Sequence, residues 1–205
     1  MKTSFTAVAL LALAASAPAS ANLIINGDFE ANPVGSAGFF SVKSGTAGIT
    51  GWTVGGNSVD LIKGNYGAIT GNSVDILGSP GPGSLSQSFA TLLDYTYTLS
   101  FDLSRNSNVN SRGTGYLDVR LNDGPVTHYT GTYGTVSHYS QSFSGTGGLV
   151  SLLFSSANVA LTNGAVLDNV SVAAVPLPVP EPESYTLMLA GLAALCGTAR
   201  RRRAA

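Results

Sequence analysis

Cysteine is almost absent from this 205-residue chain, which contains only Cys196. That residue lies in an apolar stretch near the C-terminus, so the long segment before it contains no thiol. This segment cannot be held together by a disulfide, and it cannot supply a thiol nucleophile or a cysteine-based zinc site. Its stability must come from burial of a hydrophobic core, with a bound metal as a further source.

Charge is also scarce, at 10% of the residues. Residues 22–175 contain nine acidic and five basic side chains, a net charge of −4, because four of the arginines lie at the end of the chain. There is no basic patch with interleaved aromatic residues, so nucleic-acid binding is not expected.

Lys, Glu, Arg and Gln are too few to cover long surface helices, whereas Gly, Ser, Thr and Asn are abundant. Short alternating runs with turn signals about every ten residues predict an all-β sandwich or barrel. The strongest run is 95–103, where every second residue is apolar. We expect further strands at 22–25, 39–42, 51–54, 56–62, 71–77, 84–89, 116–121, 126–129, 139–143, 149–154 and 165–172. The pairs 116–121 with 126–129 and 139–143 with 149–154 are predicted to form hairpins.

A catalytic constellation is missing as well, so we expect no enzyme. Neither His128 nor His138 lies near a nucleophile-elbow motif such as G-x-S-x-G. Asp60 and Asp75 occupy the same place in two similar runs, G-N-S-V-D, and are the only carboxylate pair that the sequence suggests. A structural role for this pair is favoured over glycoside hydrolysis.

Both ends of the chain have the composition of targeting segments. Residues 1–21 combine Lys2, an apolar run over 7–15 and the small-residue site Ala19-Ser20-Ala21, which predicts a helical signal peptide cleaved before Asn22. Residues 22–175 then form one β-sandwich domain.

At the other end, residues 176–183 form a proline-rich linker and residues 184–199 are apolar and uncharged. As a helix, this run would be about 24 Å long, against roughly 30 Å of hydrocarbon core, so it predicts a short transmembrane helix. The arginine-rich tail 200–205 would stay in the cytoplasm, which leaves the domain outside.

This tripartite order resembles the PEP-CTERM sorting signal of bacterial envelope systems. The matching residues are Val179, Pro180, Glu181, Pro182, Arg200, Arg201, Arg202 and Arg203. The resemblance implies that a membrane-embedded exosortase processes an inner-membrane-anchored precursor, which then reaches the cell surface or the extracellular matrix. The alternative is an ordinary C-terminal membrane anchor.

A second resemblance covers nearly all of residues 22–172. The runs N-L-I-I-N-G-D-F-E, G-W-T-V, Y-T-L-S-F-D-L-S-R-N and V-L-D-N-V-S-V resemble the choice-of-anchor C domain, which is similar to a plant cell-wall protein domain. It implies an antiparallel jelly-roll β-sandwich of the galactose-binding-like type found in carbohydrate-binding modules. The turn before Y-T-L-S-F departs from the pattern, with Leu92-Leu93-Asp94 where a glycine is expected.

The carbohydrate-binding jelly rolls also suggest a structural Ca²⁺. An acid just after the first strand would meet an acid on the last one, which here means Asp28 or Glu30 with Asp168, the pair Glu30 and Asp168 being preferred. The alternative is that these carboxylates only cap turns or accept backbone hydrogen bonds.

Exposed aromatic side chains next to small polar residues are typical of sugar-binding faces. The candidates are Tyr66, Tyr129, Tyr133 and Tyr139, with Asn65 and Arg105 as polar neighbours, whereas Trp52 is interpreted as core. The favoured hypothesis is non-catalytic binding of exopolysaccharide. The alternative is a structural surface protein that contacts other proteins and has no sugar site.

Overall fold

The computed structural model describes residues 21–107, 114–157, 164–175 and 188–193. The expected signal-peptide helix, the motif residues 179–182 and the four arginines lie outside these ranges. The described elements are β1 (Phe39–Lys43), β2 (Thr53–Gly56), β3 (Ser58–Ile62), the 3-10 helix η1 (Gly64–Tyr66), β4 (Ser73–Asp75), β5 (Gly83–Ala90), β6 (Thr96–Arg105), β7 (Thr114–Leu121), β8 (Thr127–Thr132), β9 (Ser137–Ser144), β10 (Leu149–Ser156) and β11 (Ala165–Val175).

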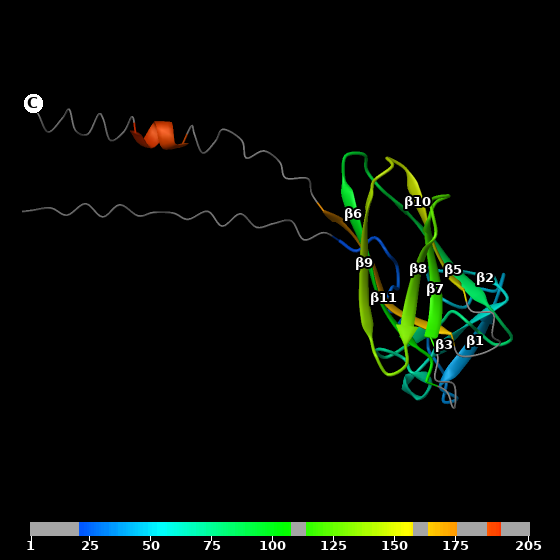
Figure 1. Cartoon of the computed structure of the whole chain (residues 1–205). Helices are drawn as coiled ribbons and strands as arrows, with labels where there is room; N and C mark the ends of the chain where they lie inside the picture. The colour runs from blue at the N-terminus through cyan, green and yellow to red at the C-terminus, as the bar shows by residue number, and fades with distance from the viewer. Residues whose placement is uncertain (1–20, 108–113, 158–163, 176–187, 194–205) are drawn as a thin grey trace, which may run out of the picture.

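The strands form two antiparallel sheets packed face to face (Figure 1). One has the order β1-β3-β4-β11-β6-β9 and the other β2-β5-β10-β7-β8. This is the predicted all-β jelly-roll sandwich. The two similar runs become neighbouring strands β3 and β4, with Asp60 directly opposite Asp75.

The core lies between the sheets and follows the alternation of each strand. In β6, the side chains of Tyr97, Leu99, Phe101 and Leu103 are buried. The alternate residues between these four face outward. Trp52 is 7% exposed and packs between Phe29 and Phe154, with ring centroids 5.7 and 6.1 Å away, and its indole N–H donates to the carbonyl of Asn26. The interpretation of Trp52 as a core residue is confirmed.

Two expectations about strands were wrong. Strands β9 and β10 do not form a hairpin, because β9 pairs with β6 in one sheet and β10 pairs with β5 and β7 in the other. The connection through residues 145–148 crosses between sheets, and Gly145 packs so closely on the carbonyl of Leu92 that a side chain would not fit. Residues 22–25 are irregular, with a bend from residue 24, rather than a strand, although the N–H of Leu23 donates to Val172 in β11.

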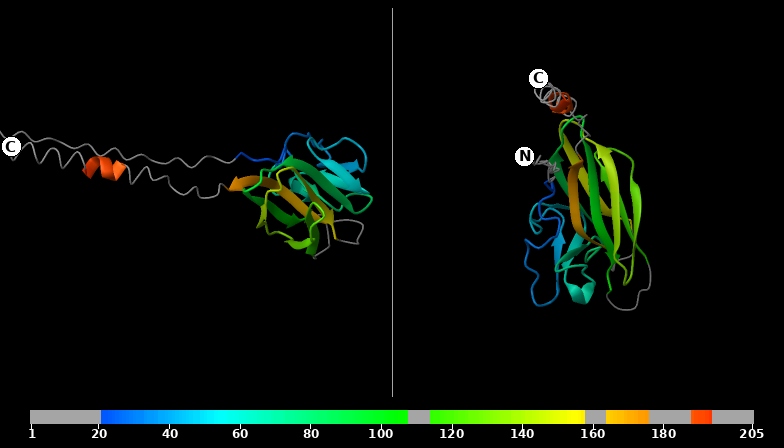
Figure 2. Two further views of the ribbon diagram at one scale, coloured as in Figure 1. Left: turned by 90° about the horizontal axis from the view of Figure 1, so that it is seen from above. Right: turned by 90° about the vertical axis from the view of Figure 1, so that its left-hand side faces the viewer.

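The two ends of the sandwich are occupied by different features (Figure 2). Val175 pairs with Thr96 at the start of β6, whereas Ala165 pairs with Arg105 at its end. Because β6 has ten residues, these two ends are about 30 Å apart. The first end carries Val175, where the domain leads into the tail, and the second carries η1 and the turn between β8 and β9. We call them the tail end and the loop end.

Beyond the domain, residues 188–193 are helical, and Met188, Leu189 and Leu192 are 59%, 65% and 47% exposed. Within the described residues there is no helix of sufficient length and apolar character to span a membrane.

Candidate functional site

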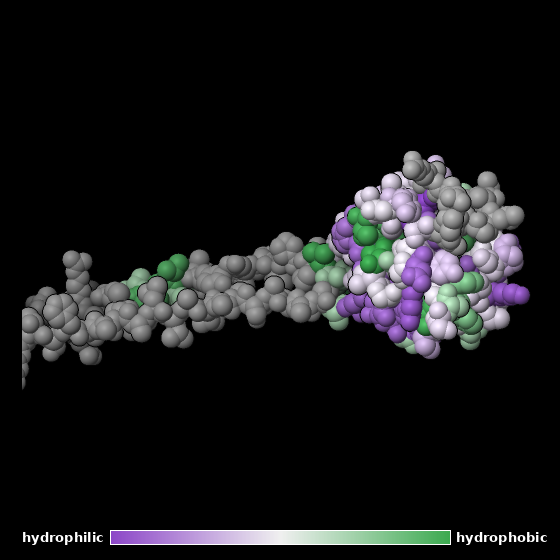
Figure 3. Space-filling model, turned by 90° about the horizontal axis from the view of Figure 1, so that it is seen from below, coloured by the Kyte–Doolittle hydropathy of each residue, from purple (hydrophilic) through white to green (hydrophobic). Residues whose placement is uncertain are grey.

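The loop end contains a hollow of about 280 Å³. Three separate parts of the chain line it: residues 67–69 after η1, the end of β6 with Ser104, Arg105 and Ser107, and the β8–β9 turn with Tyr133, Gly134 and Val136. Around it, the surface of this end is mostly of intermediate or hydrophilic character, with apolar residues in small separate areas (Figure 3).

Local backbone geometry brings these parts together. Gly67 and Gly134 have φ values of +83° and +71°, which other residues rarely adopt. The N–H of Ser107 donates to the carbonyl of Tyr66, so the end of β6 is tied to η1. A side chain on Gly67 would lie 2.9 Å from the Ser107 nitrogen, so this close approach requires glycine.

The four predicted tyrosines have two different environments. Tyr133 is 53% exposed and lines the hollow, together with Arg105, which was expected as a polar neighbour. Tyr66 lies at the same end but outside the hollow lining, half-buried against the ring of Phe39 with centroids 5.2 Å apart.

Tyr129 and Tyr139 instead close the edge of the sandwich between β8 and β9. Their ring centroids are 4.9 Å apart, and both pack on Phe101. The Tyr129 hydroxyl donates to Gln141 at 2.7 Å, and the Tyr139 hydroxyl donates to the carbonyl of Thr130 at 2.8 Å. Burial, and secondarily the neighbouring Tyr139, raise the pKa of Tyr129. These contacts are those of packing residues, and they leave Tyr133 as the predicted tyrosine best placed to meet a ligand.

A buried carboxylate, Asp75, supports the strand that forms the wall of the hollow. It accepts hydrogen bonds from the Asn106 amide at 2.7 Å and from the N–H groups of Leu77 and Gly164 at 2.9 and 3.1 Å. Burial raises the pKa of Asp75 to about 7, while the hydrogen bond from Asn106 acts in the opposite direction. Asp75 therefore ties β4 to the end of β6 and the start of β11.

Its neighbour Asp60 is also occupied by structural bonds. It accepts from the Ser41 hydroxyl at 2.6 Å and from both the N–H and the hydroxyl of Ser79. These contacts favour the structural role over glycoside hydrolysis for the Asp60–Asp75 pair.

The two preferred calcium ligands converge on the segment that precedes β4. Glu30 accepts from the N–H of Asn72 at 2.6 Å, and Asp168 accepts from the N–H of Thr70 at 3.1 Å and the hydroxyl of Ser73 at 2.9 Å. Burial raises the pKa of Asp168 to about 6. These backbone hydrogen bonds match the stated alternative. In the part of the chain that the structure describes, no group of three or more His, Cys, Asp or Glu residues could hold a metal, so Ca²⁺ stays a prediction.

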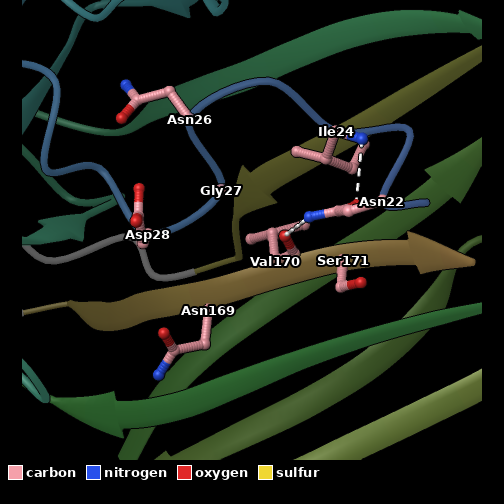
Figure 4. A pocket seen from close by; sticks show the side chains of 8 residues that line it. All are labelled: Asn22, Ile24, Asn26, Gly27, Asp28, Asn169, Val170 and Ser171. Atoms are coloured by element: carbon pink, nitrogen blue, oxygen red, sulfur yellow. Dashed lines mark hydrogen bonds between the residues drawn. The ribbon is translucent and has the colours of Figure 1, made fainter. Parts of the chain in front are cut away.

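Asp28 does not share these contacts and instead lines a polar hollow of about 400 Å³ between residues 22–28 and β11 (Figure 4). Its carboxylate accepts from the N–H of Glu30 at 3.3 Å. On the β11 side, Asn169 has a φ of +50° at an irregularity in the pairing with β6, and its amide donates to Asp102. The Asn22 side chain closes the hollow by bonding to Val170 and Val172.

Each histidine pairs with an aspartate on the adjacent strand, which the sequence interpretation missed. His128 Nδ1 is 2.6 Å from Asp118, and His138 Nδ1 is 2.8 Å from Asp102. Both rings are largely exposed, on outer faces of different sheets. In each pair, the strand register places the histidine directly opposite its aspartate. Knowledge of the register would therefore have predicted both pairs.

Residues 22–173 match the family described as "Protein of unknown function (DUF642)". The chain belongs to the DUF642 family. The finer resemblance of this DUF642 domain to choice-of-anchor C stays a prediction. Residues 178–203 match the PEP-CTERM protein-sorting motif, as the sequence indicated. This motif indicates an exported protein that is processed at the membrane and then displayed at the cell surface or secreted.

Solved structures resemble this DUF642 chain only distantly. A family 16 carbohydrate-binding module is 14% identical with a TM-score of 0.48, over 74% of this chain and 99% of that one. A family 35 carbohydrate-binding module from Clostridium thermocellum is 13% identical with a TM-score of 0.43, over 59% and 90%. The enzymatically active domain of tailspike protein 4 from bacteriophage CBA120 is 14% identical with a TM-score of 0.44, over 75% of this chain but only 21% of its own length. No curated protein matches the chain.

Proposed function

We propose that this chain is an exported surface protein that binds polysaccharide through the hollow at its loop end, without catalysing a reaction on it. The PEP-CTERM motif at 178–203 supports the export and processing part of the proposal. The observation that carries the binding part is the position of that hollow, with a half-exposed tyrosine in its wall, at the end of the domain opposite the tail.

In this proposal, the precursor is held in the inner membrane by residues 184–199 until an exosortase acts near Val179–Pro182. The exposed apolar side chains of Met188, Leu189 and Leu192 support this placement, because no described part of the domain covers them. Such a helix is stable in an apolar surrounding. The mature protein then works at the cell surface or in the extracellular matrix.

The lining of the hollow suits a sugar. Tyr133 offers a ring face for the C–H groups of a sugar, and Ser104, Arg105 and Ser107 line the same hollow. Among the residues that the structure describes, Asp75 and Asp168 are the carboxylates whose pKa values are raised. Both are buried away from a ligand in the hollow, which supports binding without catalysis.

A structural Ca²⁺ between Glu30 and Asp168 belongs to the same proposal. It would tie the N-terminal segment and β11 to the segment before β4, which both carboxylates already contact. Its role would be stability, since the domain has no cysteine.

Affinity measurements with exopolysaccharide from the producing cells and with a glycan array test the binding. We expect Tyr133→Ala to weaken binding about tenfold, which corresponds to roughly 1.4 kcal/mol for a lost aromatic contact. Tyr116→Ala is the matched control, because Tyr116 is 47% exposed on the outer face of β7. Equal affinity of the Tyr133 variant and the parent would contradict the site.

The alternative function is a structural surface protein with protein contacts only. Uniformly absent binding to glycans, together with specific capture of one envelope protein, would favour it over polysaccharide binding.

A further inference from the structure

Three leucine side chains are unusually exposed at the tail end of the sandwich. Leu92, Leu93 and Leu149 are 61%, 64% and 72% exposed, and Tyr95 and Val175 beside them are 39% and 47% exposed. We call these five residues the leucine tip. A turn such as 91–95 normally carries polar residues, and single exposed leucines are common, but two in sequence at the crest of a turn are not.

Backbone hydrogen bonds and strand pairing hold the three parts of the chain that form the tip close together. The N–H of Thr91 donates to Gly148 at 2.9 Å, and the N–H of Gly145 donates to Tyr95 at 2.8 Å, which joins the β5–β6 turn to the β9–β10 turn. Val175 pairs with Thr96, the residue after Tyr95. The turn that carries Leu92 and Leu93 therefore lies at the same end of the sandwich as Val175, where the domain leads into its tail.

The turn is braced, so the leucines are held outward. The N–H of Leu92 donates to the Tyr97 hydroxyl at 2.9 Å, and the Thr91 hydroxyl accepts from the N–H of Thr146 at 3.0 Å. The Leu93 side chain lies against Gly147, where an added Cβ would be 2.7 Å from the Cγ of Leu93. The only charged residue within the turn 91–95 is Asp94. The tip thus offers an apolar surface with almost no charge for an ionic partner.

We propose that the leucine tip inserts into the headgroup region of the bilayer that holds the precursor. This inference rests on the proposed function, in which residues 184–199 lie in that bilayer. Only residues 176–183 separate Val175 from the apolar segment, and eight residues span at most about 28 Å. The tip is therefore tethered within reach of the membrane surface.

A tethered contact needs little intrinsic affinity. A short linker raises the effective concentration to roughly the millimolar range, so a few leucines are sufficient. Burying a leucine side chain in an apolar medium is favourable, because it removes apolar surface from water. A tyrosine at the rim suits the boundary between hydrocarbon and water. The membrane contact would present the linker residues 176–183 at the bilayer surface, where an embedded peptidase can reach them.

The test uses the full chain with Cys196→Ser, reconstituted in phosphatidylcholine vesicles. An environment-sensitive fluorophore is attached to Leu93→Cys in one sample and to Tyr133→Cys, at the loop end, in another. Spin-labelled lipids should quench the probe at position 93 at least about twofold more than the probe at position 133. In the Leu92→Ser/Leu149→Ser background this quenching should fall to the level at position 133, whereas Val136→Ser, at the loop end, should leave it unchanged.

Equal, weak quenching at both positions in a chain that floats with the vesicles would overturn the inference while leaving the membrane-held precursor intact. A chain that does not float with vesicles would refute that precursor and the inference together. Shielding of position 93 that appears only when the sorting peptidase is added would replace the bilayer by a protein partner.

Discussion

The stability of the domain should fall as the pH rises from 4 to 7, because of Asp75. An unfolded aspartate has a pKa of 3.8, whereas burial raises the pKa of Asp75 to about 7. Between these values the folded state binds a proton that the unfolded state has released, so the free energy of unfolding decreases with rising pH. Above pH 7 both states are ionised and the dependence on this group ends.

The magnitude follows from the size of the shift. About three pKa units correspond to roughly 4 kcal/mol in total, of which about 3 kcal/mol falls between pH 4.5 and 7.5. Solvent does little to reduce this energy, because Asp75 is 1% exposed. Asp168, whose pKa is also raised by burial, acts in the same direction.

Denaturant unfolding at several pH values, followed by fluorescence, measures this effect. Trp52 is the only tryptophan and is buried, so its emission reports loss of the core. Asp75→Asn should flatten most of the slope, whereas Asp123→Asn, in an exposed turn, should leave it unchanged. A parent protein that is equally stable at pH 4.5 and 7.5, or a variant that keeps the full slope, would refute this reasoning.

Three further predictions concern the sandwich edge and the metal. Gly131→Ala should lower the free energy of unfolding by about 1–3 kcal/mol, because the new methyl group would meet a backbone carbonyl of β6. Gly148→Ala should change this free energy little, because the space around Gly148 is open. Tyr129→Phe should lower it by about 1 kcal/mol through loss of the hydrogen bond to Gln141, measured by the same unfolding assay. Millimolar Ca²⁺ should raise the melting temperature of the parent but not of Glu30→Gln, and identical melting with Ca²⁺ and with chelator would reject the metal.

Local alternation made the strands and the core predictable from sequence. Every second residue of β6 from Tyr97 to Leu103 is buried because one face of the strand meets the other sheet. The G-N-S-V-D runs likewise became adjacent strands. The arrangement of strands between sheets was less predictable. A glycine-rich connection such as 145–148 serves a hairpin or a crossover equally well, and only the packing of Gly145 on another turn distinguishes them.

The candidate site was predicted in part. Exposure of Tyr133 follows from its turn, but Tyr129 and Tyr139 have similar neighbours in sequence and pack inward, because β8 and β9 are edge strands whose tyrosines close the sandwich. The hollow itself joins residues 67–69, 104–107 and 133–136, which are far apart in the chain. The histidine–aspartate pairs required the exact strand register, which alternation alone does not fix.

The hydrogen bond between Asn22 and Val172 of β11 has a geometric consequence for the mature protein. In the proposed precursor the leader is removed, so the domain is connected to the membrane only through residues 176–183, which begin four residues after Val172. Adding the roughly 30 Å length of β6 to a linker of at most about 28 Å gives a reach of about 58 Å. If the linker stays attached to the membrane, the loop end can reach any point within that distance of the anchor. A longer linker would increase this distance.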